Sequence, residues 1–184
     1  MGGNTSSQKH ILIAGLDGCG KSTFLYTNIL KPGWRSSQTR GFNFEEIKVS
    51  QGRIGLWELG GELRMRELWR KFYKNIAISA IIFIVKLRDT DRTDEARAEL
   101  EYLLGEDELQ DIFLCVVANR DSQSFLGEQD RVELKEEIGK NLNFANLPVE
   151  KSRKKIFVSD VSRIEQQQLM WDWLIERMYD REDQ

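Results

Sequence analysis

The sequence has very few of the residues that zinc sites and disulfide frameworks need. It contains one histidine and two cysteines in 184 residues. A zinc site built from cysteine and histidine needs several such side chains at close spacing, so this kind of site is excluded. Cys19 and Cys115 lie far apart and do not indicate a disulfide framework. We therefore expect a protein of the reducing cytosol.

The chain also lacks long apolar runs and a strong excess of one charge. No stretch approaches the roughly 18 apolar residues of a membrane-spanning helix. The run at 76–87 is interrupted by Ser79 and ended by Lys86. The first nine residues show no apolar core of the kind that a secretory signal has. The net charge is −3, so nothing global favours nucleic acid as a partner. With 40% hydrophobic residues, the length suits one well-buried domain.

Short apolar runs alternate with segments of helical period along the chain. Four runs are typical of strands buried on both faces, as in a parallel sheet. Two more flank a Ser-Gln-Gly turn and predict an antiparallel hairpin. The alternation predicts a three-layer α/β fold. The expected strands are 10–15, 42–49, 53–59, 80–87, 111–119 and 155–160, and the expected helices are Lys21–Leu30, Met65–Lys74, Thr93–Leu104, Glu128–Leu142 and Ile164–Tyr179.

Two further features concern the organisation of the chain. No internal repeat or linker divides it, so we expect a short flexible N-terminus at 1–9 and a single domain at 10–184. In the last expected helix, four apolar residues share one face and are expected to face the core. These are Met170, Trp173, Leu174 and Met178.

Residues 15–23 read GLDGCGKST and lie between an expected strand and an expected helix. They match the phosphate-binding pattern G-x-x-x-x-G-K-[ST]. The three glycines let backbone N–H groups face phosphates, and the helix adds its positive N-terminal end. Lys21 is expected to reach the β- and γ-phosphates, and the Ser22 hydroxyl to bind Mg²⁺. The loop predicts a nucleoside phosphate without choosing the base or the reaction. The phosphate-binding residues expected from it are Asp17, Gly18, Gly20, Lys21, Ser22 and Thr23.

Beyond this loop, several stretches resemble the Arf/Arl (ADP-ribosylation-factor-like) branch of small GTPases. The sequence TRGFNFEE at 39–46 resembles its switch I, and LWELGGELRMRELWRKFY at 56–73 is similar to its W-D-x-G-G-Q…L-W switch II. Residues 93–111 look like its third helix, and WDWL at 171–174 like its last. The resemblance covers nearly the whole chain. It implies the small-GTPase α/β fold, a mostly parallel six-stranded sheet with helices on both faces.

The resemblance also implies a switch between GTP and GDP. At matching positions, Thr39 is expected to contact Mg²⁺ and the γ-phosphate, and the N–H of Gly61 to contact the γ-phosphate. Both contacts vanish when that phosphate is lost, which is how two loops are ordered by one nucleotide and released by the other. Phe42, Trp57 and Phe72 match the apolar patch that Arf-like proteins show to effectors. Ordinary core packing is the alternative interpretation of these aromatic residues.

Two acidic residues depart from the family's pattern. Glu62 stands where the family has its catalytic Gln, beside Gly61. A Gln amide accepts from the attacking water and donates toward phosphoryl oxygens, whereas an ionised Glu only accepts and adds negative charge. We therefore expect slow intrinsic hydrolysis unless Glu62 is protonated. Glu58 replaces an Asp that normally holds Mg²⁺ through water, so its extra methylene should shift the metal affinity.

A third departure concerns the base. The family's N-K-x-D motif reads Asn119, Arg120, Asp121, Ser122 here. Asn119 fits, and Arg120 can still stack on the base, but Ser122 replaces the Asp that accepts two hydrogen bonds from guanine. Losing both bonds would weaken guanine binding by ~10²–10⁴. A shifted Asp121 is one possible substitute. Near the last strand, the backbone N–H of Val161 is expected to reach the guanine carbonyl.

The first residues, MGGNTS, fit the myristoylation pattern M-G-x-x-x-[ST], with the acyl chain on Gly2. A coincidental match is the alternative. One myristoyl chain gives only weak, reversible membrane binding, on the order of 10⁴ M⁻¹. We expect a cytoplasmic protein with at most peripheral contact with intracellular membranes.

Together these features favour a divergent Arf-like GTP-binding switch, a slow GTPase that acts in intracellular and vesicle trafficking. Its expected cofactors are GTP or GDP with Mg²⁺, and its expected partners are effectors, exchange factors and GTPase-activating proteins. We expect a monomer. The competing hypothesis is a pseudo-GTPase, an interaction module that selects nucleotides weakly or binds none; Glu62 and Ser122 favour it and the intact phosphate loop opposes it. A P-loop kinase fits less well because no acceptor-substrate lid is visible.

Overall fold

The computed structural model describes residues 8–28, 39–67, 69–87, 89–120, 127–161 and 163–179. Its strands are β1 (Lys9–Ala14), β2 (Phe42–Val49), β3 (Gly52–Leu59), β4 (Ile78–Lys86), β5 (Phe113–Asn119) and β6 (Lys154–Ser159). They form one sheet in the order β2-β3-β1-β4-β5-β6. The strands from β3 to β6 pair in parallel, whereas β2 runs antiparallel to β3. The mostly parallel six-stranded sheet is thereby confirmed.

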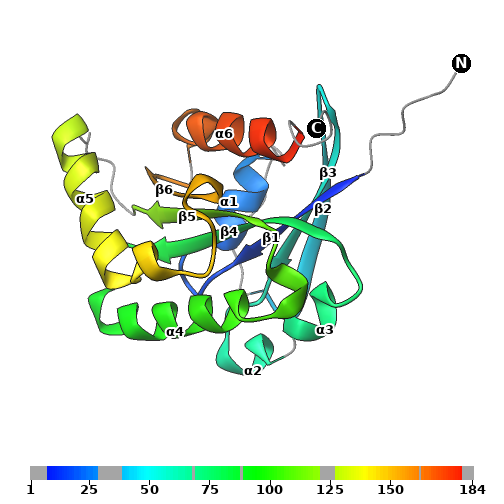
Figure 1. The fold of residues 1–184 in the computed structure, drawn as a ribbon, viewed down its shortest axis with the longest axis horizontal. Coiled ribbons are helices and arrows are strands. Elements are labelled where there is room, and N and C mark those ends of the chain that lie inside the picture. Colours follow the sequence, from blue (N-terminus) through cyan, green and yellow to red (C-terminus); the bar gives the residue numbers. More distant parts are fainter. Residues whose placement is uncertain are drawn as a thin grey trace, which may run out of the picture.

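Helices lie on both faces of this sheet (Figure 1). One face is covered by α1 (Lys21–Asn28) and α6 (Gln168–Tyr179), and the other by α3 (Trp69–Tyr73), α4 (Thr93–Leu104) and α5 (Glu128–Asn141). A short helix, α2 (Leu63–Arg66), follows β3. Single 3₁₀ turns complete the helical segments: η1 (Thr90–Arg92), η2 (Asp107–Leu109), η3 (Phe144–Asn146), η4 (Lys151–Arg153) and η5 (Ile164–Gln166).

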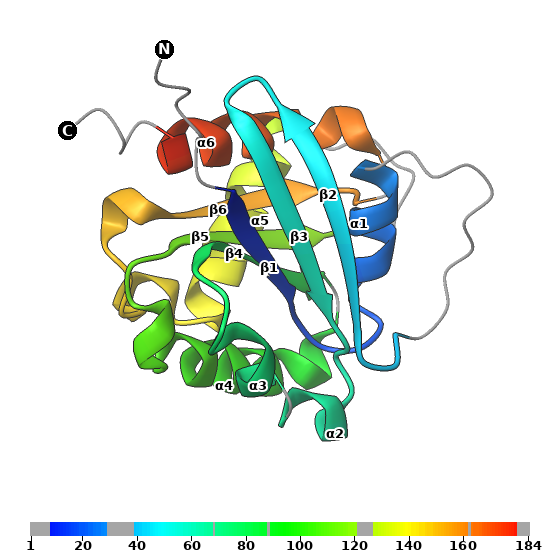
Figure 2. The same cartoon turned by 90° about the vertical axis from the view of Figure 1, so that its right-hand side faces the viewer.

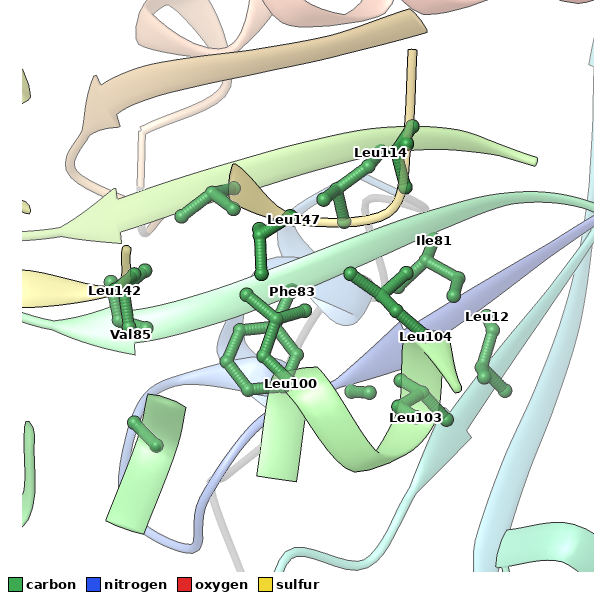
Figure 3. Packing of buried hydrophobic residues seen from close by; sticks show 14 of the residues in the cluster. Leu12, Ile81, Phe83, Val85, Leu100, Leu103, Leu104, Leu114, Leu142 and Leu147 are labelled. Atoms are coloured by element: carbon green, nitrogen blue, oxygen red, sulfur yellow. The ribbon is translucent and has the colours of Figure 1, made fainter. Parts of the chain in front are cut away.

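The two apolar cores follow from the alternation of side chains along each strand. Ile11 points to one face and packs in the same core as Phe24 of α1 and Leu174 of α6. Leu12 points to the opposite face and shares a core with Leu100 of α4, as Figure 3 shows. Each fully buried side chain of this size contributes about 1.5–3 kcal/mol. The apolar runs read from the sequence therefore form a sheet buried on both sides.

The helical segments around switch II and at the end of the chain differ in detail from the expectation. The helix expected over Met65–Lys74 is described as two short helices, α2 and α3. In α6 the expected core-facing Trp173 is only partly buried, and Trp171 is the buried tryptophan. Trp173 packs against the core cluster with its ring centroid 6.4 Å from Phe113 and 6.0 Å from Phe157. Trp171, one turn before Leu174, is the more deeply buried of the two and stacks on Phe24 with ring centroids 5.8 Å apart.

The hairpin of β2 and β3 forms one edge of the sheet (Figure 2). Its register pairs Phe42 with Leu59 and continues to Val49 with Gly52. Side chains along β2 alternate between exposed and partly buried, as expected of an edge strand that has one solvent-exposed face. The hairpin joins the segment of Thr39 to the segment that follows β3. Among the described helices, none is long and apolar enough to span a membrane.

Candidate functional site

The expected phosphate loop, the start of α1, Thr39 and the end of β3 with the segment that follows it line one cavity of about 420 Å³. This volume lies within the range of small-molecule sites, about 300–1,000 Å³. β1 and β3 run side by side in parallel, so the loops at their carboxyl ends meet (Figure 2). The lining residues are Asp17, Gly18, Gly20, Lys21, Ser22, Thr23, Thr39, Glu58, Gly61 and Glu62. The structure thus brings the expected phosphate and metal residues together.

The backbone of the phosphate loop requires glycine at two positions. Gly15 has a φ of +137°, and a Cβ there would lie 2.3 Å from the carbonyl oxygen of Ile84. Gly20 has a φ of +101°, and a Cβ there would lie 2.4 Å from Nδ2 of Asn119. Other residues rarely adopt such φ values, and no Cβ would fit at these distances. The loop can therefore pack closely on β4 and β5.

Lys21 is the positive charge of the cavity. Its side chain is buried, and Nζ donates hydrogen bonds to the carbonyl oxygens of Leu16 at 2.7 Å and Gly15 at 3.0 Å. No ion pair joins Lys21 to a carboxylate of the described residues. A buried ammonium group held by carbonyls and by the Cys19 sulfur lacks a compensating negative charge. A phosphate bound in this cavity would supply that charge.

Four polar side chains form a cluster beside Lys21. Glu58 is fully buried at the end of β3. Its Oε1 accepts hydrogen bonds from Ser22 and, at 3.1 Å, from Thr39 Oγ1, while its Oε2 accepts one at 2.7 Å from Asn43 Nδ2. The hydroxyl oxygens of Ser22 and Thr39 lie 3.0 Å apart. Hydroxyl and carboxylate oxygens are the donors that Mg²⁺ prefers, so these residues fit that ion.

The segment of Gly60 and Gly61 is held by hydrogen bonds to Gly41, Trp69 and Arg66. The N–H of Gly60 donates to Gly41 O at 2.8 Å, and its carbonyl accepts from Trp69 Nε1 at 2.9 Å. The carbonyl of Gly61 accepts from Arg66 Nε at 2.6 Å. These bonds join the two expected switch segments to each other and to the helical turns after β3.

Gly61 itself lies against the phosphate loop. A Cβ at this position would lie 2.4 Å from the backbone nitrogen of Asp17 and 2.6 Å from Nζ of Lys21. A side chain would therefore fill the space in front of the loop, and glycine keeps it open. The side chain of Glu62, the next residue, accepts a hydrogen bond from Arg64 Nε at 2.8 Å. The position at which the family has its catalytic Gln is thus occupied by an ion-paired carboxylate, that of Glu62.

An ion-pair network behind the cavity was missed by the sequence reasoning. The buried Arg66 forms ion pairs with Glu95 at 2.8 Å and Glu99 at 3.0 Å, and Arg92 forms them with Asp17 at 2.8 Å and Glu95 at 2.7 Å. The hydrogen bonds from Arg92, followed by Arg66, lower the pKa of Glu95 to about 2. The hydrogen bond from Arg92 also lowers the pKa of Asp17. The network links the phosphate loop, α2 and α4.

Asn119, at the end of β5, connects two loops. Its Nδ2 donates to the carbonyl of Cys19 in the phosphate loop at 2.8 Å. Its Oδ1 accepts from the backbone N–H of Val161 at 3.2 Å. A base carbonyl would have to share or replace this bond to use Val161 as expected. Arg120 follows and donates its N–H to Ser159 O at 3.0 Å. Asp121, Ser122 and Gly2 lie outside the described residues.

The expected effector residues form an aromatic cluster on the hairpin. Ring centroids of Phe42 lie 4.8 Å from Phe72 and 5.8 Å from Trp57. Trp57 and Phe72 are partly buried against the core, as the packing interpretation expects, whereas Phe42 is 46% exposed. The sequence reasoning missed Phe44, which is 42% exposed and lies 4.4 Å from Trp57. Its place beside Phe42 could have been inferred from the sequence, because residues two apart along a strand lie on the same face.

A mostly parallel sheet with a glycine-rich loop between its central strand and the following helix defines the P-loop small-GTPase fold. The solved structure of the Arl6 BBS3 small GTPase from Trypanosoma brucei, with the nucleotide analogue GppNp bound, shares this fold with a TM-score of 0.76 and 23% identity. The match covers 94% of this chain and 98% of that one.

The chain belongs to the ADP-ribosylation factor family, whose model matches residues 2–178. It is similar to ADP-ribosylation factor-like protein 1 of Caenorhabditis elegans, with 34% identity over 172 residues that cover 93% of this chain and 89% of that protein. It is 40% identical to ADP-ribosylation factor-like protein 1 of Saccharomyces cerevisiae over 119 residues, 65% of this chain and 64% of the yeast protein.

Proposed function

We propose that this chain is a divergent Arf-like switch that binds GTP or GDP with Mg²⁺. The segments before β2 and after β3 would change conformation according to whether the γ-phosphate is present. The observation that carries this proposal is the convergence of Lys21, Ser22, Thr39 and Gly61 on one cavity. These residues come from three separate segments. Each supplies a group that phosphate or Mg²⁺ needs, which a chance glycine-rich turn would not.

The chain's own groups divide the binding between them. Lys21 offers its buried charge, and the N-terminal end of α1 adds the positive end of its dipole. Ser22, Thr39 and Glu58 would hold Mg²⁺, which when bound neutralises phosphate charge. Gly61 leaves room for a phosphate in front of the loop, and its N–H would contact that phosphate.

The switching part of the proposal rests on the bonds around the hairpin. Thr39 precedes β2 and Gly61 follows β3, and the bond from Gly60 N–H to Gly41 O ties the two segments together. Loss of the γ-phosphate would remove a contact from both segments at once. The aromatic cluster lies on the same hairpin, so effectors docked there would sense the change.

Hydrolysis is proposed to be slow. Glu62 is ion-paired with Arg64, and its carboxylate can accept but not donate. It would place negative charge beside phosphoryl oxygens that gain negative charge in the transition state. Fast turnover would need a partner that supplies an arginine and a water-positioning group.

The proposal extends to the rest of the protein's expected behaviour. We propose a monomer with one domain over 10–184, exchange factors and activating proteins as regulators, and a role in intracellular trafficking, supported by membership of the family. Acylation of Gly2 would give weak, reversible contact with membranes. The Ser at position 122 favours the second candidate, an interaction module without base selection, because it cannot replace both acceptor oxygens of an Asp.

Hydrogen exchange tests the switch directly. Amide exchange in residues 39–49 and 52–67 is measured with GDP and with a non-hydrolysable GTP analogue bound. We expect slower exchange of both segments with the analogue, and unchanged exchange of β5, which packs in the core. Equal exchange in the two complexes would contradict a γ-phosphate switch.

A further inference from the structure

The base-reading end of the proposed site lacks the carboxylate of the family's pattern, because position 122 is a serine. Guanine presents two N–H donors side by side, its N1–H and its 2-amino group, and an ionised carboxylate can accept from both. A chain that selects guanine without that Asp needs another acceptor in its place. The described residues at this end of the sheet are those where β5 and β6 end, beginning with Asn119 and Ser159.

Asp160 is the carboxylate that the fold brings to this end of the sheet. β6 ends at Ser159, which pairs with Asn119 at the end of the neighbouring strand β5 (Figure 1). The N–H of Arg120 donates to the carbonyl of Ser159 at 3.0 Å. The residue before Asp160 is therefore bonded to the segment in which the family reads the base. Of the described residues that these two strand ends bring together, Asp160 alone carries a carboxylate.

The next residue, Val161, places a backbone donor beside this carboxylate. Its N–H donates to Asn119 Oδ1 at 3.2 Å. Val161 also lies against the phosphate loop, since a Cβ on Gly20 would be 3.0 Å from Val161 Cγ2. On the edge of guanine, the O6 carbonyl adjoins the N1–H and the amino group. A carboxylate followed directly by a backbone N–H offers the matching order of acceptor and donor.

The protein holds Asp160 from its own side. The side chain is only 15% exposed, and its Oδ2 pairs with Arg163 Nε at 3.3 Å. The N–H of Asp160 donates to Gln166 Oε1 at 3.0 Å, and its carbonyl accepts from the N–H of Arg163 at 3.0 Å. A carboxylate has about four lone-pair sites, so it can accept from Arg163 and from two further N–H donors together. Contacts of this kind hold a ligand-binding group in a defined geometry.

We propose that Asp160 is the residue that determines guanine specificity in this chain. Its carboxylate accepts from the N1–H and the 2-amino group of guanine, while the N–H of Val161 binds the O6 carbonyl. This inference rests on the proposed function and deepens it by naming the group that selects the base. Adenine has no donor at these two positions, so its binding would leave a largely buried carboxylate without those partners. Sites of this kind strongly reject such a mismatch.

The test replaces Asp160 by Asn and titrates full-length, nucleotide-free protein with GDP, ADP and xanthosine diphosphate by calorimetry in Mg²⁺. Xanthine has a carbonyl where guanine has its 2-amino group. An amide can accept from N1–H and donate to that carbonyl, whereas an ionised carboxylate cannot donate. We expect Asp160→Asn to bind GDP at least ~10-fold more weakly than wild type, and xanthosine diphosphate at least ~10-fold more tightly.

Asp172→Asn is the matched control. It makes the same chemical change at an exposed position of α6, where Asp172 bonds to Gln168, and its base preference should equal that of wild type. A merely structural role of Asp160 would weaken GDP and xanthosine diphosphate alike, and that result or an unchanged preference would overturn the proposal. The ratio of the two affinities comes from one preparation, so it does not depend on how much of the variant is folded.

A second measurement repeats the substitution in a Ser122→Asp background. With the family's carboxylate restored, Asp160→Asn should lower GDP affinity by less than about threefold, because another group then accepts from guanine. A loss as large as that in the wild-type background would overturn the proposal. Wild type that binds GDP and ADP equally would contradict the guanine switch itself. Guanine selection that Asp160→Asn leaves unchanged would contradict this inference alone, so the two failures are distinguishable.

Discussion

The side-chain amide of Asn119 donates to the backbone carbonyl of Cys19 at 2.8 Å, across 100 residues of sequence. The residue that begins the base-reading segment is thus bonded to the loop that faces the phosphates. Its other amide atom accepts from the N–H of Val161. One buried side chain at the end of β5 therefore holds two loops, and the base and phosphate ends of the proposed site are coupled through it.

Replacing Asn119 by Ala should loosen this connection. Two buried groups, the carbonyl of Cys19 and the N–H of Val161, lose their partner, which costs about 1–3 kcal/mol of unfolding free energy. Urea unfolding of the nucleotide-free protein measures the loss. Asn146→Ala is the control, because that amide is exposed and bonds only to Asn143 among the described contacts; it should change stability by less than about 0.5 kcal/mol. Equal effects of the two substitutions would contradict the bridging role.

Glu62→Gln should raise intrinsic GTP hydrolysis. The substitution restores an amide that donates toward the phosphoryl oxygens and removes the negative charge beside them. We expect single-turnover hydrolysis to rise roughly tenfold or more, since one such donor can contribute 10²–10³ elsewhere. Arg64→Ala serves as the control for simple loss of the Glu62–Arg64 ion pair. A rate that stays the same in Glu62→Gln would show that Glu62 does not limit hydrolysis.

The ion-pair network predicts a dependence of stability on pH. The pKa of Glu95 is lowered from 4.5 to about 2, so its ionised form stabilises the folded state. This contribution is fully present above about pH 5 and is lost as the pH falls from 4.5 toward 2. Because Glu95 is partly exposed, solvent screening reduces it to on the order of 1 kcal/mol.

The comparison of wild type with Glu95→Gln checks this sign. At pH 7 the variant should be the less stable protein, and the difference should shrink in acid as the wild-type carboxylate takes up a proton. Glu101→Gln, on the exposed side of the same helix α4, should show no such convergence. A difference that stays constant between pH 7 and pH 3 would contradict the ionic origin of the effect.

Tyr73 offers a prediction about packing. Its side chain is buried, and its hydroxyl has no hydrogen-bond partner among the described atoms. Tyr73→Phe removes an unsatisfied polar group and keeps the ring, so stability should stay the same or rise by up to about 1–2 kcal/mol. Thermal unfolding measures the change, with Tyr102→Phe at an exposed hydroxyl as the control. A clear loss of stability in Tyr73→Phe would show that its hydroxyl is bonded after all.

Much of the fold was predictable because its signals are local. The strand–loop–helix order around Lys21 and the two-residue alternation along the hairpin lie in short windows of sequence. The tryptophans of α6 show the limit of this reasoning: helical period placed Trp173 on the core face, where it is partly buried, but did not reveal that Trp171 packs on the ring of Phe24, far away in the sequence. The helical period predicts the direction in which each side chain points. How deeply a tryptophan is buried depends on the helix or strand that packs against it.

The site was predictable where a motif names the residue and unpredictable where the contact is distant. Lys21 and Thr39 came from motif and resemblance, and both line the cavity. The pairing of Arg66 with Glu95 spans 29 residues and leaves no local pattern. Asn43 was likewise missed, because its contact with Glu58 follows from the cross-strand register of the hairpin. Such contacts appear only when the sheet is assembled.

The central claim is that this site selects a guanine nucleotide. Calorimetric titration of nucleotide-free protein in Mg²⁺ with GDP, GTP, ADP and ATP tests it most directly, with Lys21→Ala to remove phosphate binding and Ser122→Asp to restore the family's base-reading carboxylate. The account predicts guanine nucleotides at least ~100-fold tighter than adenine ones in the wild type, which requires a group other than Ser122 to replace the family's Asp, and a further gain in Ser122→Asp. Equal affinities for the two bases, or no binding at all, would contradict it and identify an interaction module that keeps the fold without the switch.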